Sequence, residues 1–420
     1  MARQQRIVTY IPRRPFESVD VNDALKAAPK KPTPDELASF SQMLQLLEGT
    51  HARPGVMTTV PDELTANFQT FLTEVAARPE AFPASVTGPL DVNPGANNTL
   101  EVKFDEKDLI GWAGSFFTWW RKLKKFPWTP PGAPERIGND FRVAVLADWG
   151  TGLYGAPECA RAIAKDGKYQ LVLHLGDVYY SGTEGELAER FTALWPAVPG
   201  AMNRALNGNH EMYTGGNAYW KALSGAPFNQ ASSYFALEND NWLLACLDTA
   251  YAEHDLHGEQ ASWLKALADA APQKKLVLFS HHQPYSLLDK QGPALIAKLG
   301  ALLEGRIFAW YWGHEHHCII YKQHPLWGLH GRCIGHSGFP YFREKKVLGE
   351  QPPATPGWKN LNGKNLVPGA RVLDGKNEYV DEDGDQYGPN GYVTLEFSGT
   401  RLVEAYHLPD GTVVLKQIVE

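Results

Sequence analysis

From about residue 141 onward, the chain alternates short apolar runs with loops and helical segments. The runs FRVAVLA, LVLHLG, KLVLFS and RIFAWYWG have the length and composition of buried strands. The segment from Ala156 to Lys165, between the first two runs, carries apolar residues at helical spacing. This order of strands and helices predicts an α/β sandwich, in which ligand sites tend to lie just beyond the carboxyl ends of the strands.

Five loops along this part of the chain carry side chains of the kind that bind metal ions. Taken singly, each has an ordinary structural explanation, because a strand-end aspartate often caps a helix and a histidine pair near a proline often sits in a turn. Together they supply oxygen and nitrogen donors suited to iron, zinc or manganese, with a carboxylate able to bridge two ions. The loops are ADWG with Asp148, GDVYY with Asp177 and Tyr180, GNHE with Asn209 and His210, SHHQP with His281 and His282, and GHEHH with His314 and His316.

In combination these motifs resemble the calcineurin-like metallophosphoesterase superfamily, whose blocks run Asp-x-His or Asp-x-Gly, Gly-Asp, Gly-Asn-His, His and Gly-His-x-His. DWG followed by GDVYY is similar to the purple acid phosphatase branch, because Gly150 stands where the first block has a histidine and Tyr180 supplies the missing donor. The resemblance covers about residues 141 to 340. It implies a metallophosphoesterase-type α/β/β/α sandwich.

The resemblance also implies a ligand set for each of two metal ions. Between the histidines of SHHQP, His282 is preferred because it stands two residues before Pro284, as in the family's His-x-Pro turn, and His281 is the alternative. A ferric ion would be held by Asp148, Asp177, Tyr180 and His316. A divalent iron, zinc or manganese ion would be held by Asp177, Asn209, His282 and His314.

Other histidines near these blocks have less certain roles. By the resemblance, His210 faces the substrate and donates a proton to the leaving oxygen or braces the phosphoryl group. His281, His317 and His336 are candidates for lining the phosphate pocket, with an ordinary turn or supporting role as the alternative. His254 lies in the polar loop AYAEHDLHGEQ, where a role facing the substrate is the less favoured interpretation.

The implied activity is hydrolysis of phosphomonoesters in a small phosphorylated substrate by attack of a metal-bound hydroxide. Two cations would supply a nucleophile at ordinary pH and neutralise the charge that builds on the phosphoryl group. The same centre would serve a phosphodiesterase acting on a cyclic nucleotide or phospholipid headgroup, or a phosphotriesterase, because the metal blocks do not describe the groove for a second ester arm. A non-catalytic scaffold is the alternative from another class of function.

The first 140 residues differ from the rest, because proline-rich joints separate segments with helical patterns. Two of these segments, TPDELASFSQMLQLLEG and VPDELTANFQTFLTEVAA, each begin with acidic residues and continue with apolar residues at helical spacing. We expect residues 1–140 to form a mostly helical extension of unknown role. We expect residues 141–420 to form the catalytic domain, with an irregular insertion at 341–390 and closing strands at 391–420.

A further helical segment, near residues 108–125, carries an aromatic face and a basic end. Such faces usually bury against protein, so we expect this one to pack on the catalytic domain or to make a homo-oligomeric or peripheral contact. An amphipathic membrane anchor is the alternative. The aromatic residues are Trp112, Phe116, Phe117, Trp119 and Trp120.

Composition limits the partners and the compartment. The net charge is −7, from 40 basic and 47 acidic residues in no long block of one sign, so nucleic acid is not expected as a partner. No apolar run approaches the roughly 20 residues that span a bilayer, and the start lacks the apolar core of a signal peptide. The four cysteines show no CxxC spacing. We therefore expect a cytoplasmic protein, or a periplasmic or secreted one if a leader has been removed.

Overall fold

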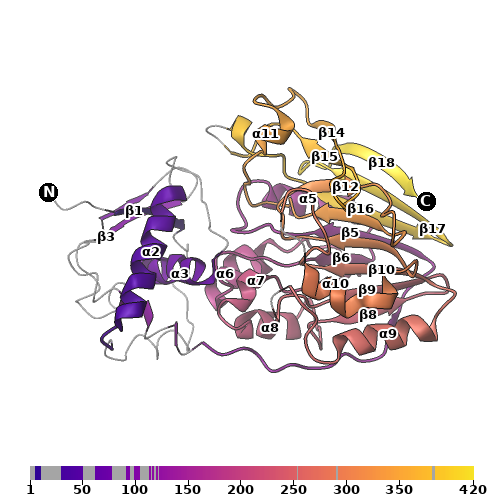
Figure 1. Cartoon of the computed structure of the whole chain (residues 1–420), viewed down its shortest axis with the longest axis horizontal. Helices are drawn as coiled ribbons and strands as arrows, with labels where there is room; N and C mark the ends of the chain where they lie inside the picture. The colour runs from indigo at the N-terminus through magenta and orange to yellow at the C-terminus, as the bar shows by residue number, and fades with distance from the viewer. Residues whose placement is uncertain are drawn as a thin grey trace. The chain divides into compact units, whose positions relative to one another are not determined.

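The computed structural model describes residues 5–10, 30–50, 62–77, 91–94, 99–104, 113–114, 116–117, 120–121 and 123–420, except 253, 290–291 and 381–383. The chain divides into two compact units (Figure 1). The first unit consists of Met1–Phe126, Tyr179–Glu189 and His210–Tyr219, and the second of Pro127–Val178, Arg190–Asn209 and Trp220–Glu420. Two short segments from the strand-end loops therefore cluster with the N-terminal region.

One of the two sheets of the second unit has six strands in the order β18-β17-β16-β5-β6-β7. Its parallel part consists of β5 (Asp140–Leu146), β6 (Leu171–His174) and β7 (Met202–Ala205). Its antiparallel part consists of β16 (Tyr392–Ser398), β17 (Arg401–His407) and β18 (Val413–Val419). Strands β16, β17 and β18 lie within residues 391–420, where closing strands were expected, and β17 and β18 form a hairpin.

The other sheet has nine strands in the order β14-β15-β12-β13-β11-β10-β9-β8-β4. Strands β8 and β9 pair antiparallel and are joined by residues 239–241. The segment 341–390, predicted to be an irregular insertion, contributes β14 and β15 to this sheet, so that prediction was wrong for these strands. The strands are β4 (Glu135–Arg136), β8 (Phe235–Glu238), β9 (Trp242–Leu247), β10 (Lys275–Ser280), β11 (Ile307–Trp312), β12 (Cys318–Tyr321), β13 (His330–Ile334), β14 (Gly357–Leu361) and β15 (Ala370–Asp374).

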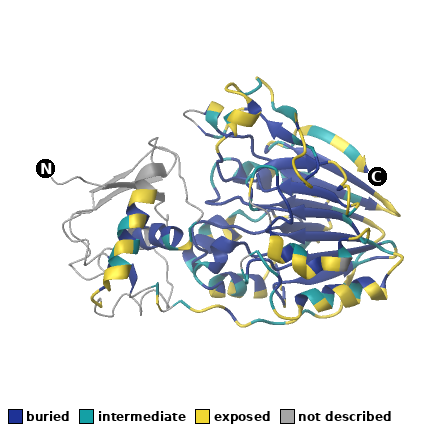
Figure 2. Ribbon diagram, in the orientation of Figure 1, coloured by how far each residue is buried: buried dark blue, intermediate teal, exposed yellow. Residues whose placement is uncertain are grey.

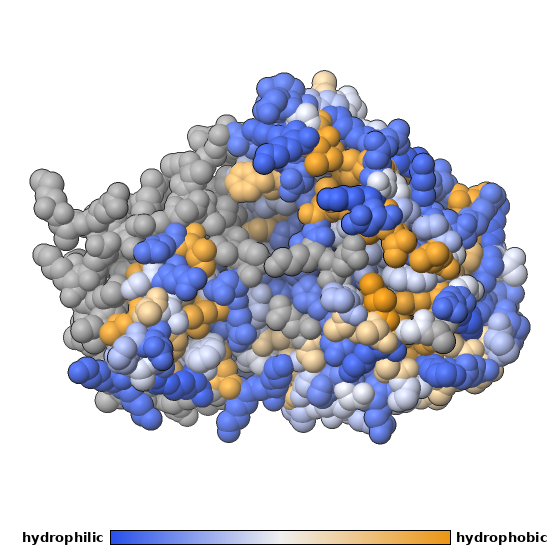
Figure 3. Space-filling model, in the orientation of Figure 1, coloured by the Kyte–Doolittle hydropathy of each residue, from blue (hydrophilic) through white to orange (hydrophobic). Residues whose placement is uncertain are grey.

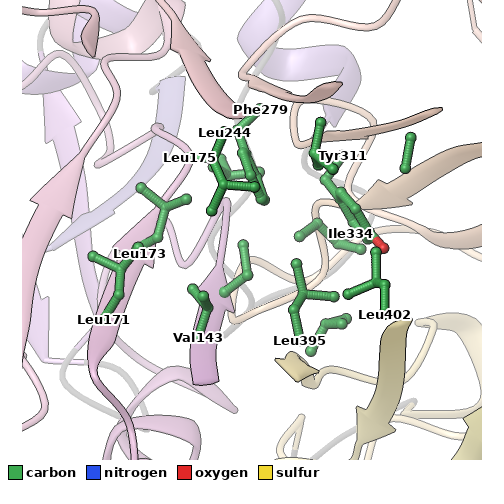
Figure 4. Packing of buried hydrophobic residues seen from close by; sticks show 14 of the residues in the cluster. Val143, Leu171, Leu173, Leu175, Leu244, Phe279, Tyr311, Ile334, Leu395 and Leu402 are labelled. Atoms are coloured by element: carbon green, nitrogen blue, oxygen red, sulfur yellow. The ribbon is translucent and has the colours of Figure 1, made fainter. Parts of the chain in front are cut away.

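The two sheets pack face to face around one apolar core. Figure 4 shows Val143 and Leu395 from the six-stranded sheet approaching Phe279 and Tyr311 from the nine-stranded sheet. Successive side chains of a strand point to opposite faces, and full burial of each such residue contributes roughly 1.5–3 kcal/mol. The buried interior of both sheets is dark blue in Figure 2.

Helices cover the outer face of the nine-stranded sheet. Strands β9 and β10 direct alternate residues, including Leu243 and Leu278, away from the central core and toward α9 (Gln260–Ala270) and α10 (Pro293–Leu299). Helix α5 (Ala156–Asp166) joins β5 to the parallel strand β6, as its apolar spacing predicted. These layers confirm the predicted α/β sandwich of the metallophosphoesterase type.

Shorter elements and scattered apolar residues complete the surface. On the face in Figure 3, small groups of apolar side chains lie among hydrophilic ones. Exposed apolar residues, such as Leu326 and Leu366, are normal for a globular protein. The short helices are α6 (Glu184–Arg190), α7 (Asn209–Met212), α8 (Asn217–Ser224) and α11 (Lys345–Leu348), with single turns η4 (Thr192–Leu194), η5 (Gly300–Leu302) and η6 (Gly384–Gln386).

In the first unit, α2 (Pro34–Thr50) and α3 (Glu63–Ala77) confirm the two predicted helices. Helix α2 begins with a capping box, in which the Thr33 N–H donates to Glu36 Oε2 at 2.8 Å and the Glu36 N–H donates to Thr33 Oγ1 at 3.3 Å. The unit also contains an antiparallel sheet that was not predicted. Its strands, in the order β1-β3-β2, are β1 (Gln5–Tyr10), β3 (Thr99–Phe104) and β2 (Asp91–Pro94).

The described part of the aromatic segment packs inside the first unit. Phe116 is fully buried, and its ring centroid lies 6.4 Å from that of Phe40, 5.4 Å from that of Phe68 and 5.7 Å from that of Phe71. Trp112 and Trp119 lie outside the described residues. A contact with another subunit through this segment stays a prediction. Among the helices of the described segments, none combines the length and the apolarity needed to cross a bilayer.

Candidate metal centre

Strand ends bring the metal-type side chains of the second unit together. Asp148 follows β5 and Asp177 follows β6, and these two neighbouring strands are parallel. Asn209 follows β7 on the same sheet edge. Backbone hydrogen bonds join the loops, because the Asp148 N–H donates to Gly176 O at 3.0 Å and the Gly313 N–H donates to His281 O at 3.0 Å. Loops far apart in sequence therefore form one cluster.

The backbone of this cluster adopts a conformation that side chains with a Cβ rarely take. Positive φ angles at such residues cost of order 1–3 kcal/mol and concentrate at functional sites. The surrounding loops must therefore hold these residues in place. Metal-type residues with positive φ are Asp148 (54°), Asp177 (72°), His254 (55°), His314 (67°) and His316 (53°).

The first group of potential ligands contains Asp148, Asp177 and His316, whose donor atoms lie within 4.8 Å of one another. His316 Nε2 is 3.5 Å from Asp148 Oδ1, and both carboxylates are almost completely buried, at 0% and 1% exposure. Asp148 Oδ2 accepts a hydrogen bond from the His314 N–H at 2.9 Å. A Cβ at Gly313 would lie 2.5 Å from Asp148 Oδ2, so this position has room only for glycine.

The second group forms around His281 Nε2. This atom lies 3.1 Å from Asn209 Oδ1, 3.3 Å from Asp177 Oδ2 and 3.3 Å from His314 Nδ1. His314 Nδ1 is itself 3.1 Å from Asn209 Oδ1. Asp177 belongs to both groups and is the one residue with a carboxylate that could bridge them.

The hydrogen bonding of His281 shows that this second group fits a metal ion. His281 Nδ1 lies 2.9 Å from Leu175 O, and a carbonyl oxygen can only accept, so Nδ1 carries a proton. In its neutral form the ring presents the Nε2 lone pair to Asp177 Oδ2 and Asn209 Oδ1, which are also acceptors. Lone pairs that converge in this way repel one another unless a cation lies among them. A backbone carbonyl that accepts the Nδ1–H is also typical of a metal-bound histidine.

His282 has different neighbours. Its Nδ1 lies 3.1 Å from Thr249 Oγ1, a hydroxyl that can either donate or accept. Its Nε2 is buried and has no hydrogen-bond partner within the described part of the chain. His282 forms a third group with His254 and His314, whose nitrogens lie within 4.8 Å. The sequence preferred His282 over His281, whereas the geometry groups His281, and not His282, with Asp177.

Burial controls the protonation of the cluster. Desolvation lowers the pKa of His314 and of His282 well below the usual value, and neighbouring imidazoles lower each further. Both rings are therefore neutral and have a lone pair for a cation.

Between the two histidines of GHEHH, burial raises the pKa of Glu315 to about 7, although Ser286 Oγ and Trp312 Nε1 donate hydrogen bonds to its carboxylate. These two bonds fasten the loop that carries His314 and His316.

Tyr180 and His210 belong to the first unit, three residues after Asp177 and one after Asn209 in the chain. Both are buried, at 0% and 3% exposure. His210 Nδ1 lies 2.6 Å from Tyr180 O and, because a carbonyl accepts, donates to it. The His210 ring lies beside Tyr179 and Tyr213, with centroids 3.8 Å and 4.8 Å away. Their roles as ligand and proton donor stay predictions.

His317 and His336, predicted to line a phosphate pocket, are also buried. His317 Nδ1 bonds Glu315 O, and His336 Nδ1 lies 3.2 Å from Ile334 O. The Nε2 atoms of both rings have no hydrogen-bond partner among the residues that the structure describes. Neither residue joins one of the three groups above, so their contact with substrate stays a prediction. His254, by contrast, joins the cluster although the sequence favoured an ordinary loop position.

Two packed sheets, with buried carboxylates and imidazoles converging beyond their strand ends, form a candidate metal centre. Residues 141–318 match the model of the calcineurin-like phosphoesterase family. The family is metal-dependent, and the match supports a hydrolase. No curated protein sequence matches the chain.

Several solved structures are similar to the chain. The purple acid phosphatase PPD1 from yellow lupin (Lupinus luteus) seeds is 15% identical with a TM-score of 0.44, over 78% of this chain and 58% of the lupin chain. GAP50, the anchor in the inner membrane complex of Plasmodium, is 13% identical with a TM-score of 0.46, over 67% of this chain and 89% of that one. PhoD is 12% identical with a TM-score of 0.42, over 69% of this chain and 70% of that one.

Proposed function

We propose that the protein is a binuclear metal-dependent phosphoesterase that hydrolyses phosphomonoesters of small substrates. The observation that carries this proposal is the position of Asp177, which belongs both to the group with Asp148 and His316 and to the group around His281. When bound, two cations about 3.5–4 Å apart would lower the pKa of a coordinated water and neutralise charge on the phosphoryl oxygens.

The residues would divide between two cations. The first cation would be held by Asp148, Asp177 and His316. By the family resemblance, Tyr180 would complete this set, and it would favour ferric iron because phenolate is a strong donor. For the second cation, a divalent iron, zinc or manganese ion, we propose His281 in place of His282. The Nδ1–H of its ring is donated to Leu175 O, so the Nε2 lone pair is available for the cation. The set would be Asp177, Asn209, His281 and His314.

His210 is proposed as the proton donor to the leaving oxygen. Its Nδ1–H is donated to Tyr180 O at 2.6 Å, which holds the ring in one orientation. In the protonated ring, Nε2–H would then point away from this bond and could be given to the leaving group. The contacts with Tyr179 and Tyr213 restrict the ring further. A fixed orientation matters because a general acid must lie within hydrogen-bond reach of the atom that it protonates.

Replacing His210 by alanine is expected to lower kcat by about 10²–10⁴-fold, the usual contribution of a positioned general acid. Both metal ions should remain bound, because none of the proposed ligands is removed. Steady-state kinetics together with metal analysis of the purified variant measure the two effects separately. Loss of metal from His210→Ala would instead move this residue into the ligand set.

The activity itself is tested by comparing para-nitrophenyl phosphate with bis-para-nitrophenyl phosphate, using natively purified protein of measured metal content. We expect the monoester to have the higher kcat/KM. A preference for the bis ester would overturn the choice of monoester and favour a diesterase. A protein fully loaded with two metals but inert toward both compounds would support a non-catalytic scaffold.

A further inference from the structure

We propose that helix α3 of the N-terminal region is a positioning element of the catalytic centre, because it holds the two loops that carry Tyr180 and His210. The roles of these two residues rest on the proposed function. The contacts that lead to the inference all lie within the first unit, which joins α3 with the segments Tyr179–Glu189 and His210–Tyr219. The N-terminal region, whose role the sequence left open, would thus serve the chemistry.

The loop after Tyr180 is organised around the buried carboxylate of Glu186, which is 2% exposed. Glu186 Oε1 accepts the Tyr180 N–H at 2.7 Å. Glu186 Oε2 accepts the N–H of Ser181 at 3.2 Å and the N–H of Thr183 at 3.0 Å. One side chain therefore fixes the backbone at the residue that bears the proposed phenolate ligand, and any shift of this carboxylate would move Tyr180.

Thr70 of α3 holds that carboxylate in place. Its Oγ1 donates to Glu186 Oε1 at 2.9 Å and accepts a hydrogen bond from Ser181 Oγ at 2.7 Å. Thr70 and Ser181 are buried, at 1% and 0% exposure. Hydrogen bonds to a charged acceptor are stronger than those between neutral groups, and burial strengthens them further. The helix is thereby connected to both the side chain and the loop that it organises.

A second contact connects α3 with the loop of His210. Asn67 Nδ2, one helical turn before Thr70, donates to Tyr213 O at 3.0 Å. Thr214 Oγ1 in turn donates to Ser181 O at 2.6 Å, so the two loops are also bonded to each other. Together with the bond from His210 Nδ1 to Tyr180 O, this network joins α3, the proposed ligand and the proposed acid.

The composition of α3 agrees with this role. An ordinary surface helix exposes its polar side chains, but four polar residues between Thr65 and Thr70 of α3 are buried, although Glu63 at its start is exposed. Burying such groups is unfavourable unless hydrogen bonds compensate, so a helix that only covers an apolar surface would not be expected to have them. Its apolar residues, including Phe68 and Phe71, pack in the aromatic cluster described above. The buried polar residues are Thr65, Asn67, Gln69 and Thr70.

The test compares full-length Thr70→Val, which removes the hydroxyl while keeping the shape, with Thr70→Ser, which keeps it. In metal-free protein, hydrogen exchange at the amides of Tyr180, Ser181 and Thr183 should accelerate in Thr70→Val and remain slow in Thr70→Ser. In the iron-loaded protein, Thr70→Val should weaken metal binding by up to about 10-fold, the lower end of the range for loss of a direct partner of a ligand, because Thr70 acts on Tyr180 through Glu186. A ferric ion bound by the Tyr180 phenolate would give a visible charge-transfer band, and this band should shift in Thr70→Val.

Ser41→Ala is the control, because the Ser41 hydroxyl donates to Leu37 O within its own helix, α2. It should leave exchange in the Tyr180 loop unchanged. Identical exchange in Thr70→Val and wild type would overturn the positioning role, and so would an equal effect in Ser41→Ala. The proposed ligand role of Tyr180 fails separately if iron-loaded wild type shows no visible band or if Tyr180→Phe leaves that band in place, and the proposed function fails separately if wild type loaded with metal does not hydrolyse para-nitrophenyl phosphate.

Discussion

Replacing Asp177 by asparagine is expected to abolish phosphoesterase activity, with kcat at least about 10³-fold lower, because the change affects both cations at once. Asp177 belongs to the group with Asp148 and His316 and to the group with His281 and His314. Asparagine keeps the size of the side chain but removes the negative charge and one of the two oxygen donors. The two proposed cations would therefore lose the ligand that they share.

Turnover of para-nitrophenyl phosphate and the number of metal ions per chain measure this effect. A matched control is Asp269→Asn, because Asp269 pairs with Lys265 at the surface with a side chain that is 60% exposed. Exposed pairs of this kind contribute about 0–1 kcal/mol, so the control should keep its activity and its metal. Near-normal turnover in Asp177→Asn would refute the bridging role.

Replacing His281 by alanine is expected to remove the second metal, whereas His282→Ala should retain it. His281 Nε2 lies 3.1 Å from Asn209 Oδ1 and 3.3 Å from Asp177 Oδ2, and its protonated Nδ1 faces Leu175 O. Loss of an outer-shell partner alone typically costs 10–100-fold in affinity, so loss of the ligand should cost at least about 100-fold. His282 instead forms a group with His254 and His314, which does not include Asp177.

Calorimetric titration of each metal-free variant with zinc measures the affinity for the metal directly and does not depend on turnover. The two variants are controls for each other, because they remove the same type of side chain from adjacent positions. The opposite result, with metal lost from His282→Ala and retained by His281→Ala, would restore the His-x-Pro interpretation that the sequence favoured.

Local patterns were sufficient to predict most of the second unit and the helices of the first. Strands such as β10 and β11 are continuous apolar runs, and α2 has its capping box at Thr33 and Glu36. Such features depend on residues close together in the chain. The metal-type loops were readable for the same reason, because four of the five follow apolar runs whose composition indicates strands.

Some elements were not predictable because their stability comes from distant partners. Strand β1 pairs with β3, about 90 residues further along the chain, and β14 and β15 are short strands added to the edge of a large sheet. The bond from Thr70 to Glu186 joins residues 116 positions apart. A threonine in the middle of a helix has no local pattern that indicates such a partner.

The amino-acid sequence by itself determined the α/β sandwich, the resemblance to a family, and the residue types available for binding metal, because strand periodicity and short motifs are local properties of the chain. Only the tertiary structure distinguished His281 from its neighbour His282, since the difference lies in which ring faces the Leu175 carbonyl and Asp177 from another sheet. The tertiary structure likewise decided that α3 belongs with the loops of Tyr180 and His210. Both the position of His281 and the grouping of α3 with these loops depend on hydrogen bonds between distant segments. Local sequence patterns do not indicate such bonds.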